Sequence, residues 1–426
     1  MVNSPPMKTI LPLTMVWLVT MTSLWANEPV DPAGARYAAL ALPFGERADW
    51  RQWDSFLTFA VKRLGQDMSA EKRDEIAEVF LDARYDLVQA INSGSSDPVP
   101  RLFLDTWERL SPIIKQSIPG ATQQSAAQFT SFATAMDGMT ALSGITQLFG
   151  LFRISPDALR GAARLLGPSA VDPLEYVMDV DNGLRAFLGF TGSLPAFRLP
   201  ANLEQSRLRV PSPQDRAAAA SSNSWFVRRA FAAPADRDSL DEWVPDIREP
   251  EPYLERVRDL LVETYGNVLS KSKLAKEHHG LYRHILLTTA WQESCWRQYV
   301  KKGEKLTPLS SATGDVGIMQ INRNVWRGVY DVKGLSGDIE YNGNAGGEIA
   351  LHYLTRYAIR KGEDKQPGGH LARATYAAYN GGPRHLTRYR AAKQNPHLKR
   401  VDEAFWDKFQ AVSSGEELAV RRCYGR

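Results

Sequence analysis

Cysteine is scarce in this sequence, which contains only Cys295 and Cys423 among its 426 residues. At most one disulfide can therefore form within the chain. In an exported protein we expect the two cysteines to be joined, and two unpaired thiols are the alternative. A bridge across so long a loop would stabilise the fold by roughly 4 to 5 kcal/mol in the chain-entropy model.

Long apolar runs are also rare. The one candidate extends from Thr9 to Ala26 after Lys8, and only about 15 of its residues are mainly apolar, fewer than the roughly 20 that a membrane-spanning helix needs. We predict that residues 1–26 are a signal peptide, with an uncleaved anchor as the alternative. The mature chain is then expected to lack a transmembrane segment and to be periplasmic or secreted.

The charge excess is small. Lys and Arg exceed Asp and Glu by 52 to 48, the sequence pI is near 8.9, and hydrophobic and charged residues make up 43% and 23% of the chain. These values are typical of globular proteins. The slight basic excess suits an anionic partner such as cell wall, membrane surface or nucleic acid, but it selects none of them.

The domain organisation follows from the order of helical and turn signals. We predict a mainly α protein in which an all-helical domain at 27–194 is followed by a Pro/Ala/Ser-rich linker at 195–252 and a second domain at 253–426. Two helices of the first domain are expected to start at Ser155-Pro156 and Asp172-Pro173, because each pair is a capping residue followed by proline.

Metal-binding patterns are incomplete. The stretch DVDNG at 179–183 has a glycine where the third ligand of an EF-hand loop is required, and no Glu follows at the twelfth position. The histidines His278, His279 and His284 lack a Cys or carboxylate at zinc spacing. We therefore predict no metal and no cofactor, and nothing in the motifs supports a nucleic-acid partner.

The stretch AWQESC at 290–295 contains an unusual carboxylate. In a helix over residues 281–296, Glu293 would project from the same face as Leu286, Thr289 and Ala290. A charge there is unfavourable, because buried carboxylates are rare without a partner. From the helix alone, pairing of Glu293 with a nearby Arg at the edge of the apolar stripe is the simpler interpretation.

Two further motifs follow in order, SATGDVGIMQ at 311–320 and AAYNGGP at 377–383. Together with the Glu-Ser pair at 293–294, they resemble the soluble type of lytic transglycosylase, a branch of the lysozyme-like superfamily, over about residues 270–400. The resemblance implies a lysozyme-like domain that cleaves the glycan strands of peptidoglycan. It also implies that Glu293 is the catalytic acid and base, and that the substrate-binding residues are Ser294, Ser311, Gly317, Met319, Gln320, Tyr379 and Asn380.

Two segments depart from the family's pattern. The connection between Ser294 and Ser311 is longer than usual and contains Lys301, Lys302 and Lys305, which either form a solvated loop or contact an anionic glycan or peptide stem. The run Asn344-Ala345-Gly346-Gly347-Glu348 replaces an expected Asn-Ile-x-x-Gly. We assign no function to this run and expect it to pack against the catalytic helix.

The implied chemistry needs a single carboxyl. Apolar surroundings raise the pKa of a carboxyl, which keeps it protonated for donation to a glycosidic oxygen. The resemblance implies that the substrate's N-acetyl group then assists and that the same Glu removes the C6 hydroxyl proton, which closes a 1,6-anhydro ring. A muramidase that hydrolyses the same bond and a non-catalytic wall-binding scaffold remain alternatives, and the N-terminal domain could bind a protein partner.

Overall fold

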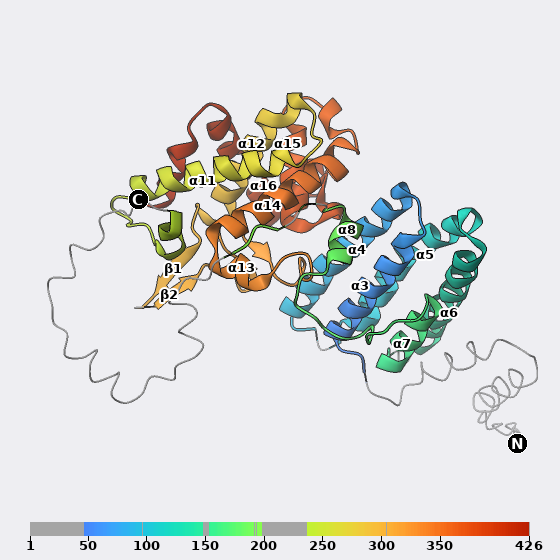
Figure 1. The fold of residues 1–426 in the computed structure, drawn as a ribbon. Helices are drawn as coiled ribbons and strands as arrows, with labels where there is room; N and C mark the ends of the chain where they lie inside the picture. Colours follow the sequence, from blue (N-terminus) through green and yellow to red (C-terminus); the bar gives the residue numbers. More distant parts are fainter. Residues whose placement is uncertain are drawn as a thin grey trace, which may run out of the picture. The chain divides into compact units, whose positions relative to one another are not determined.

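The computed structural model describes residues 47–95, 97–147, 153–190, 192, 194–197, 237–303 and 305–425. The protein is mainly helical (Figure 1), which confirms the expected fold class. The predicted signal peptide and most of the predicted linker lie outside the described residues. Within the part that is described, none of the helices combines the length and the apolarity that crossing a membrane demands.

The chain divides into two compact units. One consists of Met1–Asp67 and Val99–Glu175, and the other of Met68–Pro98 and Tyr176–Arg426. The sequence suggested a single change of domain in the linker at 195–252, whereas the chain changes unit after Asp67, Pro98 and Glu175. A segment of the expected N-terminal domain, Met68–Pro98, therefore belongs to the same unit as the motifs.

In its described residues the first unit contains four α-helices and a short 3₁₀ turn, η1 at Ile118–Gly120. Its core contains edge-to-face aromatic pairs, with ring centroids 6.0 Å apart for Trp53 and Phe103 and 5.8 Å apart for Trp107 and Phe132. The α-helices are α3 (Trp50–Gln66), α5 (Val99–Ser117), α6 (Gln123–Gln147) and α7 (Pro156–Leu165).

The second unit surrounds α12, in which the consecutive residues Ile285, Leu286 and Leu287 are all fully buried. Helices α11, α14, α15 and α16 all pack against it (Figure 1). The α-helices among the described residues of this unit are α4 (Ala70–Asn92), α8 (Asn182–Leu188), α11 (Glu251–Ser270), α12 (His279–Ser294), α13 (Val332–Gly337), α14 (Ile339–Tyr353), α15 (His370–Gly381) and α16 (Pro396–Ser413).

Short elements connect these helices. Strands β1 (Tyr299–Lys302) and β2 (Lys305–Pro308) form one antiparallel hairpin, and β3 (Asp315–Val316) pairs with β4 (Ile321–Asn322). One π-helical turn, η5 (Leu354–Ile359), continues α14. The remaining turns are 3₁₀: η3 (Arg237–Glu242), η4 (Lys276–His278), η6 (Glu363–Lys365), η7 (Pro383–His385), η8 (Arg388–Arg390) and η9 (Glu417–Cys423).

One of the two expected helix starts is wrong. Ser155 caps α7 as expected, by accepting a hydrogen bond from the backbone of Ala158. Asp172 starts no helix, because its carboxylate accepts from the backbone N–H of Leu174 and pairs with Arg160. The next helix begins only at Asn182, where Asp181 supplies the cap. A local turn and an ion pair thus compete successfully for a side chain that could have capped a helix.

The C-terminal tail is fixed to the end of α12. A disulfide joins Cys295 to Cys423, and the hydroxyl of Tyr424 donates a hydrogen bond to the carbonyl of Cys295. Cys295 itself adopts a left-handed conformation, with φ of 53°, which ends the helix. The two bonds hold η9 next to the last turn of α12, which carries Glu293.

Candidate active site

Glu293 lies in the last turn of α12. As expected from the sequence, its neighbours along the helix face, Leu286, Thr289 and Ala290, are fully buried. The Glu293 side chain keeps partial solvent exposure, although protein atoms surround most of it. A carboxyl in this position is poorly hydrated but still reachable from solvent, which is what proton exchange with a bound molecule requires.

The surroundings of Glu293 favour its protonated form. Burial raises the pKa of Glu293 from 4.5 to about 7, and the negative charge of Asp315 acts in the same direction. Hydrogen bonds from Tyr376 and Asn380 and the charge of Arg388 lower the pKa, but they do not offset the desolvation. Near neutral pH the group can therefore both give and accept a proton.

Tyr376 is the residue that holds the carboxyl, and the sequence analysis missed it. Its hydroxyl donates to Oε1 of Glu293 over 2.9 Å, and its ring stacks on Phe405 of α16 with centroids 4.1 Å apart. Burial and the nearby Glu293 raise the pKa of Tyr376 well above its usual range, so the hydroxyl remains a donor. Its position one helical turn before Tyr379 was a usable signal, because residues three apart share a face of α15.

Asn380 is the second donor to Glu293, and a buried ion pair orients it. The Arg388 guanidinium donates to the Asn380 carbonyl Oδ1 over 2.9 Å, which leaves the amide NH₂ to face Glu293. Arg388 is in turn held by Asp402, with a shortest N–O distance of 2.8 Å. The charge of Arg388 also lowers the pKa of Glu293 through space, while its hydrogen bonds go to Asp402 and Asn380.

Tyr379 faces the loop that carries the second motif. Its hydroxyl donates to the carbonyl of Met319 over 2.7 Å, and only 7% of the residue is exposed. The charge of Glu293 contributes to the raised pKa of Tyr379, so the two groups are close. The sequence motif thus places Tyr379 near the carboxyl as expected, whereas the direct hydrogen bond comes from Tyr376.

The loop at 317–320 is held mainly through its backbone. Gly317 has φ of +78°, and a Cβ atom there would lie 2.2 Å from Nδ2 of Asn342. The backbone N–H of Met319 donates to Asn342 over 2.9 Å, and that of Ile318 donates to Gln298 over 2.8 Å. Asn342 and Gln298 are fully buried and were not singled out from the sequence.

The expected substrate-binding residues differ in exposure. The side chains of Met319 and Ser294 are buried, and Ser294 donates to the carbonyl of Ile318 over 2.6 Å, which joins α12 to the loop. Gln320 is partly exposed and has an unusual left-handed backbone, with φ of 46°. Asn380 is exposed. Gln320, Asn380 and Glu293 are therefore accessible, while Met319 and Ser294 shape the loop from within.

Ser311 organises a turn around the second carboxylate, Asp315. The Ser311 hydroxyl donates to Oδ2 of Asp315 over 2.5 Å, and Thr313 donates to the same oxygen. Asn322 donates to the other oxygen, Oδ1, over 2.9 Å. Both oxygens of Asp315 are thus occupied by neutral donors, and its charge reaches Glu293 through space.

The run at 344–348, which differs from the family pattern, makes contacts with neighbouring residues. Asn344 donates only to the carbonyl of Glu340 in its own helix, and Glu348 accepts from Tyr330 and pairs with Arg185. A Cβ atom on Gly346 would lie 2.4 Å from Met319, so this glycine allows α14 to pack against the loop. The expected packing against the catalytic helix is seen at Gly347, whose carbonyl accepts a hydrogen bond from Tyr282 of α12 over 2.9 Å.

Comparison with known proteins adds one match. Residues 271–401 match the family model described as "Transglycosylase SLT domain". This range includes Glu293, the loop at 317–320 and the end of α15. Searches of the curated proteins and of the solved structures found no match for the chain.

Proposed function

The chain carries a transglycosylase SLT domain, and we propose that it is a lytic transglycosylase that cleaves the MurNAc-β-1,4-GlcNAc bond and leaves 1,6-anhydro-muramyl ends. A domain of this family supports peptidoglycan cleavage of the transglycosylase type, and hence action outside the cytoplasmic membrane. The proposed reaction with its anhydro product rests on the environment of Glu293. This carboxyl has a pKa of about 7 and is held by the neutral donors Tyr376 and Asn380.

In the proposed mechanism Glu293 first acts as an acid. Its proton passes to the glycosidic oxygen, the bond between that oxygen and C1 of the muramyl residue breaks, and the GlcNAc leaves with a free 4-hydroxyl. The substrate's N-acetyl oxygen stabilises the positive charge that develops at C1. Tyr376 and Asn380 then stabilise the Glu293 carboxylate, because both donate hydrogen bonds to it.

Glu293 next acts as a base. The carboxylate removes the proton of the muramyl C6 hydroxyl, whose oxygen bonds to C1 and closes the anhydro ring. The C6 proton replaces the one that the carboxyl gave to the leaving group, so no water is consumed and no second carboxylate is needed. Gln320 and the backbone of the loop at 317–320 are proposed to line the sugar site, with Ser311 holding the adjacent turn.

The alternative is a muramidase that uses water, and Asp315 is the observation in its favour. Most glycosidases use two carboxyl groups, one on each side of the glycosidic bond that is cleaved. The hydrogen bonds from Ser311, Thr313 and Asn322 to Asp315 favour a fixed electrostatic role over nucleophilic attack, because both oxygens are already engaged. We therefore propose that Asp315 helps to keep Glu293 protonated.

Product analysis in ¹⁸O-labelled water tests the proposal. Purified sacculi are digested with the protein, and the released muropeptides are analysed by mass spectrometry beside a Glu293→Gln control. A transglycosylase gives anhydro ends without ¹⁸O, whereas a muramidase gives reducing ends that carry one ¹⁸O. Reducing ends from the wild type would overturn the proposed reaction, and equal cleavage by the Gln variant would overturn the role of Glu293.

A further inference from the structure

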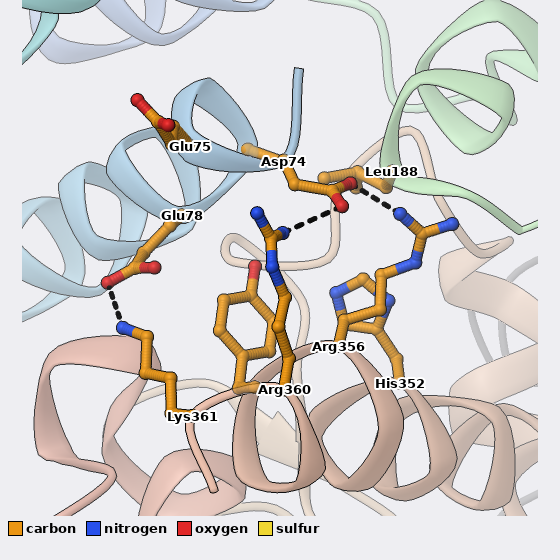
Figure 2. A pocket seen from close by; sticks show the side chains of 10 residues that line it. Asp74, Glu75, Glu78, Leu188, His352, Arg356, Arg360 and Lys361 are labelled. Atoms are coloured by element: carbon orange, nitrogen blue, oxygen red, sulfur yellow. Dashed lines mark hydrogen bonds and ion pairs between the residues drawn. The ribbon is translucent and has the colours of Figure 1, made fainter. Parts of the chain in front are cut away.

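Helix α4 lies outside the matched range 271–401 and yet packs within the same unit. Figure 2 shows one end of this contact, where Asp74 and Glu78 of α4 face cations that follow α14. Asp74 pairs with Arg356 and Arg360, and Glu78 pairs with Lys361 over 2.7 Å. A cavity of about 150 Å³ remains between the two sides.

The acidic stripe continues along α4 toward the candidate site. Asp74, Glu78, Asp82 and Asp86 recur at every fourth residue, so they lie along one side of the helix. Asp82 is buried and accepts from the backbone N–H of Arg384 over 2.9 Å. Asp86 pairs with the Arg384 side chain over 2.5 Å. The far end of α4 is therefore fixed to η7, directly after α15.

Tyr85 of α4 completes the end of α15. The last carbonyls of a helix lack partners within it. At the end of α15 the carbonyl of Ala378 accepts from Gly382, and the carbonyl of Tyr379 accepts from the Tyr85 hydroxyl over 2.9 Å. Gly382 has no room for a side chain, since a Cβ atom would lie 2.7 Å from the Tyr85 ring.

These contacts bracket Asn380, which donates to Glu293. Tyr85 holds the carbonyl just before Asn380, and Asp82 holds the N–H of Arg384 just after the glycines. Tyr85 is also close enough to Glu293 for the carboxylate charge to contribute to the raised pKa of its hydroxyl. The hydroxyl thus remains a donor while Glu293 cycles between its two forms.

We propose that the C-terminal half of α4 belongs to the active centre, with Tyr85 and Asp82 as positioning residues that fix the end of α15 and, through Asn380, the carboxyl of Glu293. This inference rests on the proposed function of Glu293. It assigns a role in the reaction to a helix that precedes the matched domain by more than a hundred residues in the sequence.

The test compares Tyr85→Phe with Glu78→Gln in the full chain. Tyr85→Phe removes one hydroxyl and keeps the ring, whereas Glu78→Gln weakens α4 docking at the other end of the acidic stripe. For each protein, kcat, KM and the pH profile of kcat are measured on solubilised glycan strands, with thermal unfolding as the check of folding. If Tyr85→Phe fails to fold, Asp82→Ala replaces it, because that variant frees the N–H of Arg384 instead.

We expect Tyr85→Phe to lower kcat roughly 10- to 100-fold with little change in KM, since a small misplacement of catalytic groups is costly. The basic limb of the profile should also move to higher pH, because a loosened Asn380 lowers the pKa of Glu293 less. Glu78→Gln should have the kcat and the pH profile of the wild type. An unmoved basic limb, or a kcat equal to that of Glu78→Gln, would overturn the inference. An inactive wild type would instead count against the proposed function itself.

Discussion

Four carboxylates of the second unit show two kinds of surroundings. Asp74, Glu78 and Asp402 face Arg or Lys side chains, whereas Glu293 receives its hydrogen bonds from Tyr376 and Asn380, which are neutral. A cation near a carboxylate stabilises its charged form, and burial without one stabilises the protonated form. The difference separates carboxylates that hold the fold together from one that is suited to proton transfer.

The contrast between Glu293 and the paired carboxylates depends on which groups Arg388 contacts. This guanidinium lies near Glu293, and its charge lowers the pKa of Glu293. Its Nε and Nη2 nevertheless donate to Asp402, and Nη2 also donates to Asn380. The arginine is thus held by Asp402 and Asn380 through hydrogen bonds, and it acts on Glu293 by its charge through space. The carboxyl keeps a pKa of about 7, where a directly paired carboxylate would stay charged.

The largest expected effect is the loss of activity on replacing Glu293 with Gln. General acid-base catalysis contributes about 10²- to 10⁴-fold, and one group performs both steps here, so we expect a loss at or above the upper limit. The measurement is release of soluble muropeptides from sacculi. Substantial cleavage by a folded Glu293→Gln variant would mean that another carboxyl performs the chemistry.

The same variant should become more stable than the wild type as the pH rises. The pKa of Glu293 is near 4.5 in the unfolded chain and about 7 in the fold, so below pH 4.5 both states are protonated and Glu293 carries no penalty. As the pH rises through 7 the wild type should lose at most about 3 kcal/mol that the Gln variant keeps. Thermal unfolding from pH 4 to pH 8 checks the sign, and equal pH dependence in both proteins would contradict it.

Replacing a cation-paired carboxylate with its amide should lower the stability of the protein, in contrast to the change at Glu293. Asp402→Asn leaves Arg388 buried without its counter-ion, and breaking such a pair costs about 3 to 5 kcal/mol. We expect a large fall in the free energy of unfolding in urea at pH 7. Unchanged or increased stability would show that the Arg388–Asp402 pair contributes nothing to the fold and would remove the contrast with Glu293.

A smaller effect is expected from Tyr376→Phe. Loss of the hydroxyl removes a hydrogen bond that lowers the pKa of Glu293, so the basic limb of the kcat profile should move to higher pH, with kcat reduced roughly tenfold. Tyr389→Phe is the matched control, because Tyr389 donates to the buried Glu363 over the same 2.9 Å. If both variants gave the wild-type profile, Tyr376 would have no part in setting the pKa of Glu293.

The smallest effect should come from Glu78→Gln. Its partner Lys361 is 44% exposed, and pairs of this kind stabilise proteins by about 0 to 1 kcal/mol. Unfolding in urea at low and high salt should show a difference from the wild type of that size or less, and smaller at high salt. A loss comparable to that of Asp402→Asn would show that the acidic stripe of α4 contributes far more than exposed pairs usually do.

Local signals predicted much of this protein correctly. The apolar period around Glu293 predicted a helix, and α12 follows it from His279 to Ser294. The glycines after Asn380 predicted the end of α15. The start expected at Asp172 failed, because an ion pair with Arg160 and a local turn use the same carboxylate. Which partner a side chain takes depends on residues that are remote in the sequence but close in space.

The sequence by itself determined the helical class, the helix that carries Glu293 and the order of the motifs, because these depend on residue types at short spacings. Only the tertiary structure showed that Tyr376 holds the carboxyl, that Asp402 orients Asn380 through Arg388, and that α4 packs at the end of α15. These relations join residues far apart in the chain. Their energies come from burial and from pairing in space, which local spacing does not encode.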